Sequence, residues 1–168
     1  GTLGLIYNSL GAAFEHNENY DSSAYYYQRS LDENLRTGNV NYLPTSYCKV
    51  AAVQLLKGNL NESLTYFMRA LEISDSTGNK QAQVNSLLGL SGWYVDQSNE
   101  KEAEQCLLRA QQIAGSLSDQ SFNIKALTQL ALFRKNHGRF EESLLLQEKI
   151  NGLINSLNDW ERQRIVKS

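Results

Sequence analysis

Hydrophobic residues recur along this chain at spacings of three, four and seven positions. This is the period of an amphipathic α-helix, whereas a half-buried strand alternates at every second residue. The pattern therefore predicts an all-α protein built from paired helices. We expect the first helix of each pair at residues 4–17, 43–57, 81–97 and 121–136. We expect the second at residues 20–36, 60–76, 100–116 and 140–156, with a further helix beginning at Trp160.

The same pattern repeats every 40 residues. Four stretches align without a gap, and they begin at Tyr7, Tyr47, Leu87 and Leu127. One column of the alignment is apolar throughout and holds Leu10, Val50, Leu90 and Leu130. Two further columns hold only small residues, namely Gly11, Ala51, Ser91 and Ala131, and then Ser23, Ser63, Ala103 and Ser143. Small residues at two fixed points allow the two helices of a repeat to approach closely.

Turn and capping residues fall between the predicted helices. Asn19, Asn59 and Asn99 stand before three of the second helices, where an Asn side chain can accept a hydrogen bond from a free backbone amide. Gly38 and Gly78 follow two of them, and glycine supplies the left-handed conformation that ends many helices. Each repeat is thus predicted to be a helical hairpin. We expect a single domain over residues 1–168, with repeats at 4–40, 41–80, 81–120 and 121–158 and a terminal helix at 159–168.

Composition and charge exclude several classes of protein. The net charge of −2 and the isoelectric point near 5.7 disfavour nucleic-acid binding. No apolar run approaches the roughly 18 residues that a membrane-spanning helix needs, so we predict no membrane span in this chain. Gly1 resembles a residue left by cloning, and the sequence ends within a helical pattern. We therefore expect a piece of a longer polypeptide, whose flanking segments would decide between a cytoplasmic and a periplasmic location.

Candidate chemistry is sparse. The two cysteines, Cys48 and Cys106, are far apart and belong to no Cys/His cluster, so packing is the expected role of each. His16 and His137 lie in or beside separate turns, without a Ser or Cys partner at a useful spacing. No phosphate-binding loop, nucleophile elbow or zinc-protease motif is present in the sequence. We predict no enzyme activity, no metal and no cofactor.

Three segments resemble tetratricopeptide repeats. They are LGAAFEHNENYDSSAYYY, KGNLNESLTYFMRAL and HGRFEESL, whereas the third repeat departs from the motif at Ser98 and Glu100. The 40-residue period is longer than the usual 34 of that family. This longer form resembles arrays in bacterial regulators, including peptide-sensing ones and those that precede a coiled coil in membrane-bound sensor kinases.

The resemblance implies a right-handed α-solenoid of four hairpins whose first helices line a concave face. The candidate partner-binding positions on that face are Asn8, Ala12, Glu15, Thr45, Cys48, Asn85, Leu88, Lys125, Thr128 and Lys135. Such a groove suits a protein or peptide partner, as in the sensory or scaffolding part of a larger bacterial regulator. Two alternatives stay open, namely self-association into a homo-oligomer and the sensing of a small ligand. Capture of a chaperone tail is disfavoured, because Asn8 and Ala12 stand where that clamp needs Lys and Asn.

Overall fold

The computed structural model describes the backbone of residues 2–166 and the side chains of residues 2–159. This part of the chain consists of α-helices and turns, without a strand. The helices are α1 (Thr2–His16), α2 (Tyr20–Arg36), α3 (Leu43–Leu56), α4 (Leu60–Thr77), α5 (Lys80–Asp96), α6 (Glu100–Ala114), α7 (Gln120–Asn136) and α8 (Phe140–Val166). The first seven agree with the sequence-based boundaries to within two residues at each end.

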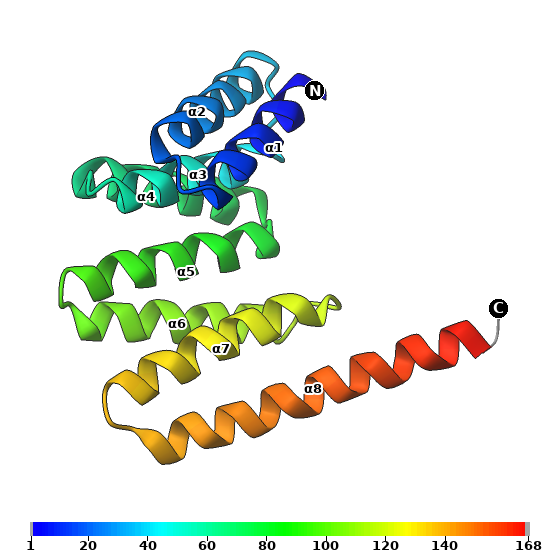
Figure 1. Cartoon of the computed structure of the whole chain (residues 1–168). Helices are drawn as coiled ribbons and strands as arrows, with labels where there is room; N and C mark the ends of the chain where they lie inside the picture. The colour runs from blue at the N-terminus through cyan, green and yellow to red at the C-terminus, as the bar shows by residue number, and fades with distance from the viewer. Residues whose placement is uncertain (1, 167–168) are drawn as a thin grey trace.

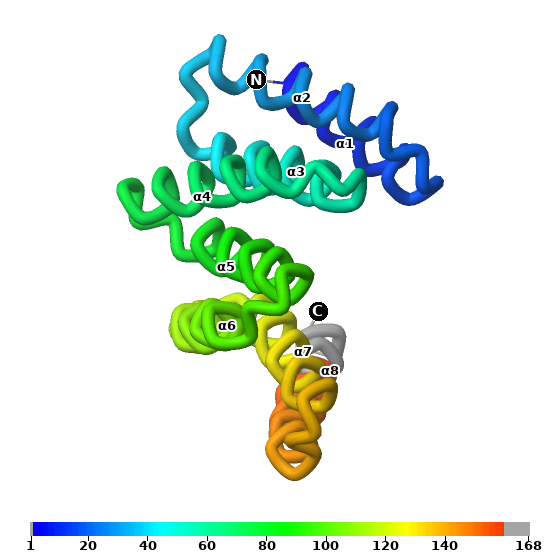
Figure 2. The backbone as a smooth tube through the Cα atoms, turned by 90° about the vertical axis from the view of Figure 1, so that its left-hand side faces the viewer, coloured from blue at the N-terminus to red at the C-terminus, as the bar shows by residue number. Residues whose placement is uncertain are grey.

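The helices form four hairpins that stack in chain order. Each helix packs against the next one along the chain, and the first helices also meet across the stack, α3 with α5 and α5 with α7. Figures 1 and 2 show the α1–α2 hairpin at one end of the molecule and the α7–α8 hairpin at the other. The predicted all-α solenoid is thus confirmed.

The repeating columns form the core between the hairpins. A further column holds large apolar residues in the first three repeats, Tyr27, Phe67 and Leu107, and each of them is at most 3% exposed. Gln147 at the same position of the last repeat is exposed. The small columns allow the close helix contacts that the sequence predicts. A Cβ atom added to Gly11 would lie only 2.5 Å from Cδ1 of the Tyr27 ring. A larger residue at position 11 would therefore displace that ring.

The turns inside the hairpins share one backbone conformation. Glu18, Gly58, Ser98 and Gly138 occupy the same column, and all four have a positive φ between 55° and 79°. The third repeat thus folds like the others even though Ser98 replaces the usual glycine. Asn19, Asn59 and Asn99 occupy the predicted N-cap positions, but only the Asn19 side chain accepts a capping hydrogen bond, from the Ser22 amide at 3.1 Å.

Two caps that the sequence analysis did not assign begin the first helices of the last two repeats. The Asn79 side chain accepts a hydrogen bond from the Ala82 amide at 3.1 Å, and the Asp119 carboxylate accepts one from the Ser121 amide at 3.0 Å. Side-chain caps therefore also stand between hairpins, where the sequence indicated only turns.

The predicted break before the terminal helix is wrong. α8 runs without interruption from Phe140 to Val166, so residues 159–166 continue the second helix of the last repeat. The sequence pattern predicted a break between residues 156 and 160, but no Gly or Pro stands there, and Asn158 and Asp159 remain helical. The side chain of Trp160 lies outside the described residues. None of the described helices is both long enough and apolar enough to cross a membrane.

Candidate binding groove on the first helices

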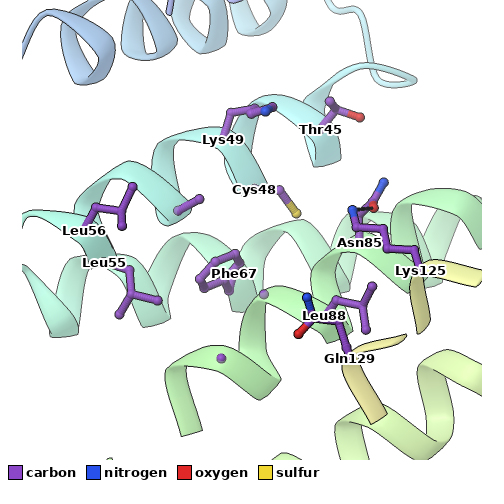
Figure 3. Close-up of a pocket in the computed structure, with 13 residues that line it drawn as sticks. Thr45, Cys48, Lys49, Leu55, Leu56, Phe67, Asn85, Leu88, Lys125 and Gln129 are labelled. Atoms are coloured by element: carbon purple, nitrogen blue, oxygen red, sulfur yellow. Dashed lines mark hydrogen bonds between the residues drawn. The ribbon is translucent and has the colours of Figure 1, made fainter. Parts of the chain in front are cut away.

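A cavity of about 500 Å³ opens on the side of the molecule that the first helices line (Figure 3). Its walls come from α3, α5 and α7, and one ring from α4 lies among them. The lining residues are Thr45, Cys48, Lys49, Ala52, Leu55, Leu56, Phe67, Asn85, Leu88, Gly89, Gly92, Lys125 and Gln129. We call this the central cavity.

Two neighbouring cavities extend it along the stack. One of about 430 Å³ lies toward α1, and Leu56 belongs to its lining and to that of the central cavity. Another of about 200 Å³ lies toward the end of α7, and it shares Leu55, Gly92 and Gln129 with the central cavity. The three cavities together form a groove that passes all four first helices, and we call it the first-helix groove.

The structure brings most of the predicted positions to this groove. Thr45, Cys48, Asn85, Leu88 and Lys125 line the central cavity, and Ala12 and Glu15 line the cavity toward α1.

Three predicted residues, Asn8, Thr128 and Lys135, belong to none of these linings. The Thr128 hydroxyl donates to the Ile124 carbonyl of its own helix at 2.8 Å. On α7 the neighbouring Gln129 reaches the groove instead.

Several lining residues were not among the predicted partner-binding positions. Lys49, Gly89 and Gln129 form one column, directly after the predicted column of Cys48, Leu88 and Thr128. Adjacent positions on a helix are about 100° apart, so both columns can border one groove. Phe67 belongs to the core, and its ring also lines the cavity beside Gly89. A Cβ atom at Gly89 would lie 2.6 Å from the Cδ1 and Cζ atoms of that ring.

Two lysines set the charge of the central cavity. The Lys125 amino group donates a hydrogen bond to the Asn85 side-chain oxygen at 2.9 Å (Figure 3). Desolvation and the charge of Lys49 both lower the pKa of Lys125. Lys49 lies 3.9 Å from a Glu15 carboxylate oxygen and 5.4 Å from the centre of the Tyr27 ring. Glu15 itself also accepts a hydrogen bond from the Tyr27 hydroxyl.

The thiol of Cys48 is a poor nucleophile in this setting. Its sulfur lies 3.3 Å from the Ser86 hydroxyl, and burial raises its pKa to about 11. A thiol that stays protonated near neutral pH neither attacks an electrophile nor binds a metal readily. The lining of the central cavity holds neither a carboxylate nor an imidazole. Its mixture of apolar and hydrogen-bonding side chains is suited to holding a ligand.

Similarity to known proteins agrees with this geometry. Residues 42–116 match the tetratricopeptide repeat family. No curated protein matches the sequence significantly.

Solved structures with the same arrangement of helices include BtubC (BKLC) from P. vanneervenii, at 18% identity and a TM-score of 0.74. That match covers 93% of this chain and 65% of BtubC. The apo form of RapI matches at 18% identity with a TM-score of 0.76, over 96% of this chain and 59% of RapI.

A third match is a signal transduction ATPase with numerous domains from Pyrococcus horikoshii, described as having a tetratricopeptide repeat sensor. It is 18% identical with a TM-score of 0.70, over 95% of this chain and 25% of that protein. This chain thus spans less than two thirds of each of these three structures. At such identities the likeness concerns the fold alone.

Proposed function

Because this chain belongs to the tetratricopeptide-repeat family, we propose that it is a non-enzymatic module that binds a peptide segment of a partner protein in the first-helix groove. The supporting observation is that three cavities with shared lining residues follow one another along the first helices. The central cavity, of about 500 Å³, has the size of sites that hold small ligands or several peptide side chains. An extended peptide can follow such a channel from α1 to α7.

The lining supports binding of this kind. Leu55, Leu88 and Phe67 offer apolar surface, whereas Thr45, Asn85 and Gln129 offer hydrogen-bonding groups. Peptide recognition uses both, since apolar pockets receive side chains and amide groups pair with the peptide backbone. The helices that carry these groups pack in a continuous stack, so little ordering is needed before a ligand binds.

A blocking substitution tests the proposal. Gly92→Trp places an indole in the first-helix groove, and Met68→Trp places one on a residue that is 50% exposed and lines none of the cavities. Peptides selected on the unaltered chain from a displayed library of random twelve-residue sequences should lose binding to the first variant and keep it on the second. The proposal is refuted if no peptide is selected, or if the selected peptides bind Gly92→Trp unchanged.

The finer proposal is that this module is the sensory or scaffolding part of a larger bacterial regulator. The support is fold-level, because one similar structure is a signal transduction ATPase described as having a tetratricopeptide repeat sensor. The complete reading frame tests it. A kinase, ATPase or DNA-binding domain in the same polypeptide would support the proposal, and a frame that encodes repeats alone would contradict it.

Self-association is a second candidate function, favoured by the two ends of the stack. Leu10 is 38% exposed, whereas Val50, Leu90 and Leu130 in the same column are at most 4% exposed. Those three are covered by the preceding hairpin. On α8, Phe140 and Leu144 are 66% and 62% exposed. In the 40-residue register they match residues 20 and 24 of α2, which pack toward α3.

The α8 surface of one copy would therefore cover the α1 surface of a second copy by the same contact that joins successive hairpins. If this contact forms, light scattering will show each of the variants Leu10→Glu and Leu144→Glu to be monomeric. An equimolar mixture of the two will form a dimer through the remaining intact pair of surfaces. A chain that stays monomeric at high concentration contradicts this candidate.

A further inference from the structure

We infer that the fourth hairpin, α7–α8, is a movable wall of the first-helix groove, held to the third hairpin along one edge by ion pairs where the earlier hairpins are held by apolar contacts. We call the contact between two successive hairpins a joint. The inference goes beyond peptide binding, since it concerns the shape of the groove, and its test uses the chain alone.

The third joint, between α6 and α7, differs from the first two in composition. Two columns of the second helices lie near the turns inside the hairpins and face the next hairpin. One holds Tyr20, Leu60 and Glu100, and the other holds Ala24, Leu64 and Glu104. Tyr20, Ala24 and Leu64 pack against core clusters that include residues of the following hairpin. The third joint thus has a carboxylate in both columns, where the first two have apolar side chains.

These two carboxylates form a charge cluster with the fourth hairpin. Glu104 pairs with the guanidinium group of Arg134, near the end of α7, and with that of Arg139, in the following turn, at 2.7 Å. The Nε2 atom of His137 lies 3.3 Å from a carboxylate oxygen of Glu100. All three contacts join α6 to the fourth hairpin, at the edge of the stack where the turns inside the hairpins lie.

A cluster of this kind holds two hairpins less firmly than an apolar contact. The free energy of removing charged groups from water offsets much of the attraction between them, and exposed pairs contribute little. Arg134 is only 12% exposed, whereas Glu100 is 68% exposed. The Nε atom of Arg134 is buried, and it has no hydrogen-bond partner within the part of the chain that the structure describes. A buried donor without a partner destabilises the closed joint.

The place of the fourth hairpin at the end of the stack allows it to open alone. A hairpin in a repeat array contacts its neighbours, so an end hairpin is released when a single joint opens. The first hairpin also has one joint, but Tyr27 and Val53 belong to a core cluster there. In the third joint the opposite edge is apolar, since Ala114 and Ala126 share a core cluster beside the connection at 115–119. This edge can stay packed as a hinge while the charged edge opens.

Movement of α7 would change the groove directly. α7 supplies Gln129 to the central cavity, and it supplies Leu132 and Phe133 to the cavity of about 200 Å³ toward its end. The opposite wall of that smaller cavity comes from α3 and α5. His137, a member of the charge cluster, lines the same cavity. Opening of the cluster therefore widens the smallest cavity of the groove first, and a bulky side chain of a ligand can enter there.

Native-state hydrogen exchange at pH 7, followed by mass spectrometry, measures the opening of each helix. The matched pair is α7 and α2, because each belongs to an end hairpin and lies directly at its joint. After correction for intrinsic exchange rates, we expect the amides of α7 to exchange at least roughly tenfold faster than those of α2. Exchange of α7 and α2 at one common rate would overturn the inference.

Single substitutions test the role of the charges. Glu104→Gln should speed exchange of α7 by about tenfold and leave α2 unchanged, because hydrogen bonds to charged groups are stronger than neutral ones. Glu141→Gln, at an exposed carboxylate of α8 that forms no ion pair within residues 2–159, is the control and should leave α7 unchanged. Asp21→Asn removes the ion pair with Lys57 across the first joint, and it should leave α2 unchanged because apolar contacts hold that joint.

A combined variant tests the inference in the opposite direction. Glu100→Leu, Glu104→Leu and Arg134→Tyr together give the third joint the residues that stand at these columns in the second, Leu60, Leu64 and Tyr94. Replacement of partly buried ion pairs by apolar side chains is often stabilising, so exchange of α7 should slow toward that of α2. Circular dichroism checks that the variant keeps its helices.

Three further results would overturn the inference. They are equal effects of Glu104→Gln and Glu141→Gln on α7, uniform acceleration of all helices by Glu104→Gln, and unchanged exchange of α7 in the combined variant. None of them bears on peptide binding, which is refuted separately if no selected peptide is blocked by Gly92→Trp.

Discussion

Two glycines of α5 give a paired prediction, because the same substitution should change stability in opposite directions three residues apart. Gly89→Ala and Gly92→Ala both replace a helical glycine by the best helix former. Each gains about 0.5–1 kcal/mol from helix propensity. The rest of the change in the free energy of unfolding depends on what surrounds the new methyl group, and the surroundings differ between positions 89 and 92.

At Gly92 the methyl group meets no atom within 4 Å, so the propensity gain should be realised in full. At Gly89 it would lie 2.6 Å from two ring carbons of Phe67, well inside the 3.5–4.0 Å at which carbon atoms attract each other. Phe67 is 3% exposed and packs in a core cluster with Ala51 and Leu90, so these contacts oppose a displacement of its ring. Overpacking of this kind costs about 1–3 kcal/mol, so after the propensity gain Gly89→Ala should be less stable than the unaltered chain by up to roughly 2.5 kcal/mol.

Urea denaturation followed by circular dichroism measures both changes, and the slope of the transition should stay the same. For a chain of 168 residues, 1 kcal/mol corresponds to roughly 2–4 °C in the melting temperature. We therefore expect a small rise for Gly92→Ala and a fall of several degrees for Gly89→Ala. A gain in both variants would mean that the Phe67 ring is not held against α5, and a loss in both would mean that position 92 is packed.

Three further predictions concern single side chains. Ser63→Ala should destabilise the chain by about 1 kcal/mol in urea denaturation, because the fully buried Ser63 hydroxyl donates to the Ala51 carbonyl at 2.9 Å. The hydrogen bond and charge of Arg139 lower the pKa of Glu104 from its ordinary 4.5, so this carboxylate stabilises the fold above that pH and the contribution is lost as the pH falls. Glu104→Gln should therefore be less stable at pH 7, and the difference should shrink toward pH 3. Alkylation of Cys48 by iodoacetamide at pH 8, followed by mass spectrometry, should be on the order of a hundredfold slower in the folded chain than in urea, since burial raises its pKa to about 11.

The sequence was sufficient for the architecture because the repeat supplies each structural signal four times. Ser98 and Glu100 weaken the third repeat when it is considered alone, yet the shared register still places its turn correctly, with a φ of 55° at Ser98. The end of α8 has no such support. It depends on whether the chain leaves the helix at Asn158 or continues it, and no Gly or Pro there ends the helix.

The candidate site was only partly predictable, for a different reason. The family resemblance implies that the first helices line the groove, and on that basis Cys48, Asn85 and Lys125 could be assigned to it in advance. The number of side-chain columns that border the groove cannot be inferred in the same way. For this reason Lys49 and Gln129 were not predicted to line it. The presence of Phe67 in the cavity wall depends on two helices at once, since it requires both the ring on α4 and the missing side chain of Gly89 on α5.

The 40-residue repeat also places different charged residues in different parts of the groove. Side chains of one column meet across stacked first helices, as the hydrogen bond between Asn85 and Lys125 shows at a separation of 40 residues. Lysines at columns bordering the groove stand in the second and fourth repeats, whereas the cavity toward α1 is lined by Glu15 and Glu18. The formal charge of the lining therefore differs along the groove, with carboxylates beside α1 and amino groups in the centre. A peptide that lies along the groove would meet carboxylates beside α1 and amino groups in the centre, so complementary charges on the peptide would favour one orientation over the other.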